Sequence, residues 1–213
     1  MLAAFKNFSL FCAQMKAETN WHTTISLSEV HKERVGQLVN YLAFRLRPYL
    51  YSTKLFKLLY ILDERSIVET GIPISWLKYN VYEMGPVPEN IWINIKTGNE
   101  LLGDYFDVLE KDGKYQILPV SQADLSEFSK REVELIEEII NEYGTSATEN
   151  IIDYLHEENS LWYKIVKENN ISFKHSPATD YVIDLTDRIK GDNNKMMLFN
   201  AANEEIKILE SFT

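Results

Sequence analysis

The sequence of 213 residues has little cysteine, glycine, proline or basic charge, and each shortage excludes a class of protein. A single cysteine, Cys12, excludes an intrachain disulfide framework and a metal site built from several cysteines. The 8 glycines and 6 prolines are too few for a collagen or a linker-rich chain, and low for an all-β sandwich. No run approaches the roughly 18 apolar residues that a membrane-spanning helix needs. A net charge of −10 argues against bulk nucleic-acid binding, although a local basic patch stays possible.

What the sequence does contain is ample material for a packed core, with 45% hydrophobic and 12% aromatic residues. A globular chain of this length buries roughly 70% of the surface that it exposes when unfolded. The first 13 residues are fairly apolar, but Lys6 and Asn7 interrupt the run that a secretory signal would need. We therefore expect a soluble, cytoplasmic protein whose residues 1–27 form an N-terminal arm.

Hydrophobic residues recur at helical spacing over most of the chain. The pattern predicts helices over residues 28–46, 52–69, 129–144, 146–156, 160–166 and 200–212. A further helix is predicted to carry Ile91, Trp92 and Ile95, with Pro86 or Pro88 in its first turn. A serine followed three residues later by glutamate is a capping box, which begins a helix. Two such pairs, Ser129 with Glu132 and Ser146 with Glu149, are predicted to begin helices.

One β-hairpin is predicted in the middle of the chain. An Asp-Gly pair lies between two β-prone runs, residues 105–110 and 114–118, which is typical of a tight hairpin. Residues 181–185 could form a strand, residues 74–81 a short helix or an extended stretch, and residues 84–88 a rigid elbow. The predicted fold class is mainly α (α+β): a compact helical bundle with a small β-hairpin.

Charge is distributed unevenly along the chain. Residues 124–158 contain eleven acidic residues against two basic ones, a balance of −9. Residues 31–57 contain six basic residues against Glu33 alone, a balance of +5. Two interpretations stay open: the two regions attract each other within the fold, or one of them steers a partner of opposite charge.

No enzyme constellation stands out. The glycines never cluster, so there is neither a P-loop nor a dinucleotide-binding fingerprint. His156-Glu157-Glu158 resembles half of a zincin motif, but Ser160 occupies the place of the second histidine. Adjacent acids such as Asp63-Glu64 diverge on a helix, so we expect them on its solvated surface. We therefore predict no catalytic residue, no cofactor and no metal site, and we do not expect an enzyme.

Three local stretches are unusual. Residues 54–62 are apolar around much of the helix circumference, which indicates a central helix. Residues 79–88 are rich in aromatics, and Gly85 and two prolines give them a rigid elbow. Residues 156–162 place a histidine at a helix C-terminus, where the dipole favours a cation, and Trp162 is expected to anchor the next segment in the core.

In this order, the three stretches resemble the Panacea domain, the SocA-like antitoxin family of bacteria and their phages. That family has a Lys-Leu-x-Lys-Leu-Leu-Tyr helix, then an aromatic-rich Tyr-Gly-Pro-Val elbow, and later a His-x-Glu segment leading to a tryptophan. The matching residues are Lys54, Leu55, Lys57, Leu58, Leu59, Tyr60, Gly85, Pro86, Val87, His156, Glu158 and Trp162. Met84 replaces the usual tyrosine before the glycine, with Tyr82 nearby. The resemblance covers roughly residues 34–166.

The resemblance implies a mostly helical antitoxin domain, residues 28–166, that neutralises a cognate toxin protein by direct binding. No catalytic residues are established for the family, and its founding antitoxin also hands its toxin to an energy-dependent protease. Residues 167–213 are expected to pack on the domain as a C-terminal extension. DNA and membrane partners are not expected, and the oligomeric state stays open.

Several alternatives to a masking antitoxin stay open. One is a proteolytic adaptor or a regulator of the operon's DNA, for which the basic balance of residues 31–57 is the support. Another is a phage-associated accessory protein. A third is an enzyme acting on a small ligand, with a site gathered from Lys54, Tyr82, His156 and Glu158.

Partner contact is predicted at the elbow and the helix before it. A mask covers the active surface of its toxin, so aromatic anchors and steering charges matter more than reactive groups. The predicted partner-binding residues are Lys54, Lys57, Tyr82, Met84, Gly85, Pro86 and Trp92. Lys54 and Lys57, or else the acidic helices, would supply the steering charge.

Overall fold

The computed structural model describes residues 29–210 and, within them, the side chains of residues 31–208. The predicted arm and Cys12 lie outside the described residues. The helices are α2 (Glu29–Leu46), α3 (Ser52–Thr70), α4 (Glu89–Lys96), α5 (Lys130–Tyr143), α6 (Thr148–Leu155), α7 (Leu161–Glu168) and α8 (Asn193–Glu210), with a 3-10 helix η1 (Leu185–Arg188). The strands are β1 (Tyr79–Tyr82), β2 (Gly85–Pro88), β3 (Phe106–Lys111), β4 (Lys114–Pro119) and β5 (Ala178–Ile183). This arrangement is mainly helical with small antiparallel sheets, so the predicted α+β class is confirmed.

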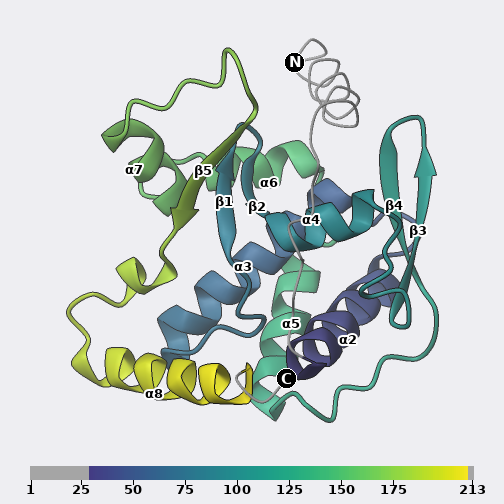
Figure 1. The fold of residues 1–213 in the computed structure, drawn as a ribbon, viewed down its shortest axis with the longest axis horizontal. Coiled ribbons are helices and arrows are strands. Elements are labelled where there is room, and N and C mark those ends of the chain that lie inside the picture. The colour runs from purple at the N-terminus through teal and green to yellow at the C-terminus, as the bar shows by residue number, and fades with distance from the viewer. Residues whose placement is uncertain (1–28, 211–213) are drawn as a thin grey trace.

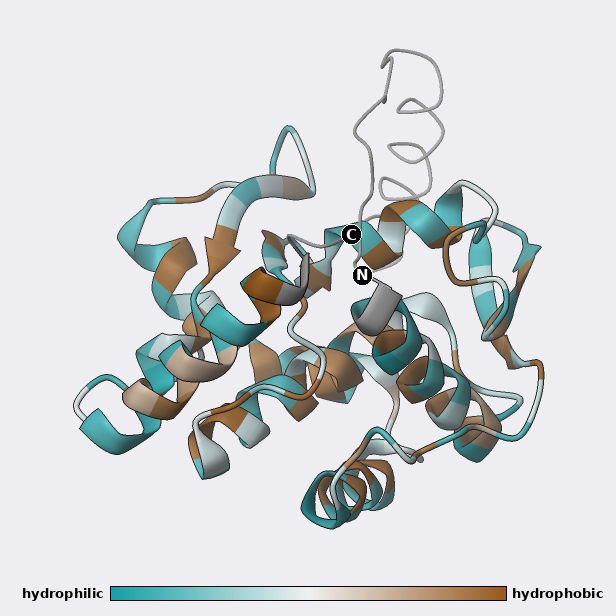
Figure 2. Cartoon of the chain, turned by 60° about the horizontal axis from the view of Figure 1, so that its bottom comes forward, coloured by the Kyte–Doolittle hydropathy of each residue, from teal (hydrophilic) through white to brown (hydrophobic). Residues whose placement is uncertain are grey.

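Helix α3 runs through the middle of the molecule (Figure 1). It contacts α5, α6, α8, η1 and the β1–β2 hairpin. Leu55, Leu58 and Leu59 are fully buried in it, and most of its other residues are buried as well. A helix surrounded in this way must be apolar around most of its circumference, which is the pattern that its sequence shows. Figure 2 shows hydrophobic and hydrophilic residues mixed along the other helices.

The predicted hairpin is confirmed as β3–β4, but the expectation of a single hairpin is wrong. The predicted elbow, residues 84–88, forms the end of the turn and the second strand of a second hairpin, β1–β2, and β5 pairs with β1 to give a three-stranded sheet of order β2-β1-β5. Two prolines made a strand hard to recognise at residues 85–88. The fold accepts them because β2 lies at the edge of the sheet, where a missing N–H donor breaks no ladder bond.

One of the two predicted capping boxes forms. The hydroxyl of Ser129 accepts from the backbone N–H of Glu132, whose carboxylate accepts in return from the backbone N–H of Ser129. The prediction for Ser146 is wrong, because α6 begins at Thr148 with Ala147 as its cap, and the Ser146 hydroxyl lies 3.4 Å from the carbonyl oxygen of Glu142. Helix α8 also begins at Asn193, well before the predicted residue 200.

Helices α2 and α5 lie side by side (Figure 1), and their opposite charges meet. Arg34 and Arg45 of α2 form ion pairs with Glu132 and Glu137 of α5. The interpretation that the basic and acidic regions attract each other within the fold is therefore confirmed for these residues.

The part of the chain after α7 is attached to the body at several points. Besides the pairing of β5 with β1, Trp76 stacks on Phe199 of α8 with ring centroids 5.3 Å apart. The Lys195 amino group donates to the carbonyl oxygen of Val68 at 2.6 Å. None of the helices within residues 29–210 is both long and apolar enough to cross a membrane.

Candidate functional site

The three sequence motifs meet around the turn of the β1–β2 hairpin. Lys57 of α3 donates a hydrogen bond from Nζ to the carbonyl oxygen of Pro86, at 2.8 Å. Trp162 of α7 donates from Nε1 to the carbonyl oxygen of Tyr82, also at 2.8 Å. Side chains from two helices thus hold the hairpin backbone, one on each side of its turn.

Gly85 is the first residue of β2, directly after that turn, and has a φ of 95°, which residues with a side chain rarely adopt. A Cβ atom placed on Gly85 would lie 3.4 Å from Nζ of Lys57 and 3.6 Å from Nε2 of His156. The first and third motifs therefore reach the same point of the second. We call Lys57, Gly85, His156 and Trp162 the motif centre.

Burial lowers the pKa of both basic groups in the motif centre. Lys57 is fully buried, and desolvation lowers the pKa of its amino group to about 7. Desolvation and the nearby charge of Lys57 lower the pKa of His156 to about 4. His156 is the residue that caps the C-terminus of α6. His156 thus lies at the helix end as expected, but desolvation lowers its pKa where the helix dipole alone would favour the cation.

The neutral His156 ring is held by stacking. It lies on the indole of Trp162 with ring centroids 3.8 Å apart and an angle of 12° between the rings. Phe173 in turn stacks on the indole of Trp162, with ring centroids 6.0 Å apart. Among the described residues, His156 Nε2 is buried without a hydrogen-bond partner. The contacts of the motif centre are ring faces and backbone carbonyls, an arrangement that fixes a hairpin in place.

The other motif residues also lie inside, with one exception. Leu55, Leu58, Leu59, Tyr60 and Val87 are buried, and Glu158 is exposed. The Tyr60 hydroxyl donates to Glu64 at 2.8 Å, and Arg188 of η1 donates to the same carboxylate oxygen at 2.9 Å. Most of the family motif thus lies in the core.

Asp63 is the most notable residue that sequence reasoning misplaced. It is fully buried rather than solvated, and it accepts hydrogen bonds from the backbone N–H of Ser75 at 2.6 Å, the Ser75 hydroxyl and the Tyr79 hydroxyl at 2.8 Å. Desolvation raises the pKa of Asp63. Its neighbour Glu64 is 9% exposed. The sequence did indicate this burial, because a helix that is apolar around most of its circumference has no solvent-exposed face on which Asp63 and Glu64 could lie.

The structure gives the predicted partner-binding lysines internal partners. Lys54 is 5% exposed, and its amino group donates to the carbonyl oxygens of Gly144 at 2.6 Å and Ser146 at 2.9 Å. Lys57 is fully buried against Pro86, as described above. Neither amino group is placed to contact a partner in this conformation.

The predicted aromatic contacts also face inward for the most part. Tyr82 is 6% exposed, and its hydroxyl donates to Glu89 at 3.0 Å. Trp92 is 8% exposed and meets Phe56 edge to face. Gly85 and Pro86 are buried, while Met84 in the turn is partly exposed. Partner contact through this turn stays a prediction, with Met84 as its accessible residue.

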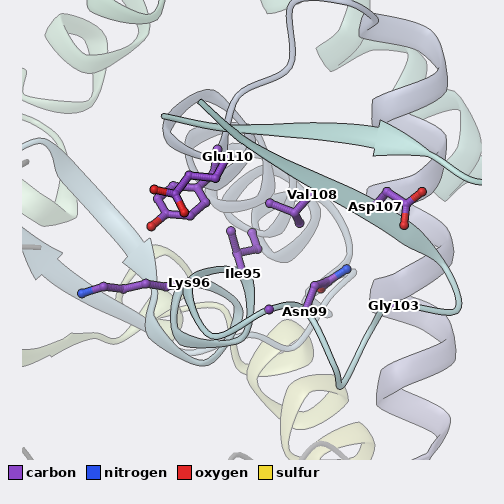
Figure 3. A pocket seen from close by; sticks show the side chains of 9 residues that line it. Ile95, Lys96, Asn99, Gly103, Asp107, Val108 and Glu110 are labelled. Atoms are coloured by element: carbon purple, nitrogen blue, oxygen red, sulfur yellow. The ribbon is translucent and has the colours of Figure 1, made fainter. Parts of the chain in front are cut away.

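A hollow of about 220 Å³ lies between α4 and the β3–β4 hairpin (Figure 3). Lys96, Asp107 and Glu110 are among the residues that line it, together with the buried Asn99. The Asn99 side chain is already occupied, since it accepts from Asn94 and donates to the carbonyl oxygen of Phe106. None of the residues proposed for a small-ligand enzyme site lines this hollow.

The residues proposed for a small-ligand enzyme site, Lys54, Tyr82, His156 and Glu158, have separate contacts in the structure. His156 lies in the motif centre, while the amino group of Lys54 is held at the end of α5. The Tyr82 hydroxyl is bonded to Glu89, and Glu158 is exposed. Within the part of the chain that the structure describes, no three His, Cys, Asp or Glu side chains are grouped to hold a metal ion.

Comparison with known proteins adds one finding. Residues 55–163 match the family model described as antitoxin SocA-like, Panacea domain. The chain belongs to this family. The matched span runs from α3 to the start of α7 and contains the whole motif centre, whereas β5 and α8 of this Panacea protein lie outside it. No curated protein and no solved structure matches the chain.

Proposed function

We propose that this protein is an antitoxin that neutralises a partner toxin by direct protein–protein binding in the cytoplasm. The observation that carries the proposal is the family match over residues 55–163, which contains every residue of the three motifs except Lys54. Those motifs build the motif centre, where Lys57 and Trp162 anchor the β1–β2 hairpin. A rigid scaffold suits a mask, because a preformed surface loses little conformational entropy on binding.

The regulator alternative has lost most of its support. It rested on the basic balance of residues 31–57, which would attract nucleic acid. In the structure, Arg34 and Arg45 are paired with carboxylates of α5, and Lys54 and Lys57 donate to backbone carbonyls. Transfer of the toxin to a protease and an association with phage stay predictions.

The proposal is tested by expressing the neighbouring gene with and without this protein. We expect the neighbour alone to stop bacterial growth, and this chain to restore growth and to co-purify with the neighbour. Leu58→Asp is the matched control, because a carboxylate in place of the fully buried Leu58 should unfold the scaffold and abolish rescue. A harmless neighbour, or rescue without any complex, would contradict masking by direct binding.

A further inference from the structure

Residues 49–51 extend the β3–β4 hairpin as a short third strand. The backbone N–H of Ile117 donates to the carbonyl oxygen of Leu50 at 2.9 Å, and Tyr51 forms an antiparallel bridge with Gln116. Side chains alternate as in a strand: Leu50 is fully buried, while Tyr49 is 74% and Tyr51 41% exposed. Both tyrosines therefore lie on the outer side of this segment.

The outer face of the hairpin continues the same surface. Leu109, 50% exposed, lies opposite Gln116 in the register, and Lys111 lies opposite Lys114. Tyr51, Leu109, Lys111 and Lys114 line one shallow hollow of about 230 Å³. We call the following residues the aromatic–basic surface: Arg47, Tyr49, Tyr51, Leu109, Lys111 and Lys114. In Figure 1, the end of α2 that leads into it lies beside β3 and β4.

The charge of this surface opposes that of the whole molecule. Like charges directly opposite each other on a hairpin are destabilising, and Lys111 and Lys114 form such a pair, with Asp112 as the acidic residue that lines the hollow. The Arg47 guanidinium lies over the Phe44 ring, 4.5 Å from its centroid. Within residues 31–208, none of these three cations forms an ion pair.

Other basic residues of segment 31–57 differ from these cations, because Arg34 and Arg45 form ion pairs and Lys54 and Lys57 donate to backbone carbonyls. Exposed tyrosines, an exposed leucine and cations without an ion pair thus lie on this surface. They have the composition of a protein interface, which is enriched in aromatic residues and arginine.

We propose that the aromatic–basic surface binds the toxin, and that the toxin meets it with an apolar contact rimmed by acidic side chains. This inference rests on the proposed antitoxin function and deepens it. The tyrosines and Leu109 supply contact area, and the three cations steer an acidic partner toward it. A protein partner is favoured over nucleic acid because the net charge is −10 and the cations are few.

The test measures binding of the purified neighbour-encoded protein to variants of the full chain. Tyr49→Ala should weaken binding at least about tenfold, because exposed tyrosines at interface centres are frequent hot spots. The double variant Lys111→Glu/Lys114→Glu should slow association about tenfold and reduce its dependence on ionic strength. Melting temperatures should stay close to wild type, because these side chains are exposed.

Two matched controls lie on β5 and in the segment before it, outside the aromatic–basic surface. Tyr181→Ala removes a tyrosine that is 46% exposed on β5, and Lys174→Glu reverses an exposed lysine. Both should change affinity less than about twofold.

The outcomes distinguish failure of the proposed surface from failure of the proposed antitoxin function. If wild type rescues growth and all variants bind equally well, the aromatic–basic surface is overturned and the antitoxin function stands. If wild type neither rescues nor binds, the function itself fails, and this inference fails with it. If Lys111→Glu/Lys114→Glu impairs binding to DNA or RNA while toxin binding is unchanged, the surface belongs to nucleic acid and the proposal is wrong.

Discussion

Along α3, two lysines and two carboxylates are buried. The carboxylates of Asp63 and Glu64 each accept hydrogen bonds from neighbouring elements, and the Lys57 amino group donates to a backbone carbonyl. A buried ionisable group without such partners would cost several kcal/mol. Apart from Tyr60 of α3 itself, the partners come from η1, β1, β2 and the loop residue Ser75, so these side chains also select which segments pack on α3.

Lys57 should give the stability of the protein a distinctive dependence on pH. Its pKa is about 7 in the folded state, and an unfolded lysine keeps a pKa near 10.4. Between pH 7 and 10 the unfolded chain therefore binds more protons, and the free energy of unfolding rises with pH, by up to about 1.4 kcal/mol per pH unit from this site. Lys57→Met should reduce that slope, measured by urea unfolding at pH 7 to 9.5.

The matched control for this measurement is Lys114→Met, because Lys114 is exposed on the hairpin and should leave the slope unchanged. Lys57→Met also leaves the Pro86 carbonyl without its donor, which should lower stability by about 1–2 kcal/mol at all pH values. An unchanged slope in Lys57→Met would show that the amino group keeps its proton in the folded state.

At the scale of elements, the prolines of β2 and the serine–glutamate pairs before α5 and α6 show that the effect of a local sequence pattern depends on its structural context. Pro86 and Pro88 stand in β2 because that strand is an edge, and their missing N–H groups also leave the edge few donors for another chain. Helices α5 and α6 are preceded by the same serine–glutamate spacing, yet only Ser129 caps its helix. The serine–glutamate spacing is thus not sufficient for a capping box, because the helix must also begin directly after the serine.

A pair of serine variants tests this difference. Ser129→Ala should destabilise the protein by about 1 kcal/mol, because the first turn of α5 loses the acceptor for the Glu132 N–H. Ser146→Ala should change stability by less than about 0.5 kcal/mol, because its hydroxyl caps no helix. Urea unfolding of both variants measures the two costs. Equal costs would mean that Ser146 caps α6 in solution.

At the scale of the whole molecule, charge joins α2 to α5. Glu137 accepts from both Arg45 and the Tyr41 hydroxyl, and the partial burial of these groups limits screening by salt. The Arg45 side chain lowers the pKa of Glu137. Two regions of opposite charge, distant in sequence, are therefore partners in the folded molecule.

A charge swap tests this pairing. Arg45→Glu should destabilise the fold by about 1 kcal/mol, since it places a carboxylate beside Glu137. Adding Glu137→Arg should restore most of that loss, which a double-mutant cycle at low salt would measure. The control Arg47→Glu lies two residues further on and should leave stability within about 0.5 kcal/mol, while weakening toxin binding. Lack of restoration by the swap would mean that Arg45 acts mainly through packing.

The sequence by itself determined the positions of most helices, the β3–β4 hairpin, the Ser129 cap and the family, because periodicity, turn residues and motifs are local properties. The sequence-based prediction put Asp63 on a solvated surface and Lys57 among the partner-binding residues, and it did not pair β5 with β1, since the partners of a buried charge lie on segments that only the fold brings together. Only the tertiary structure decided which cations remain unpaired. Arg34 and Arg45 meet α5, whereas Arg47, Lys111 and Lys114 meet solvent, because ion pairing depends on which elements become neighbours.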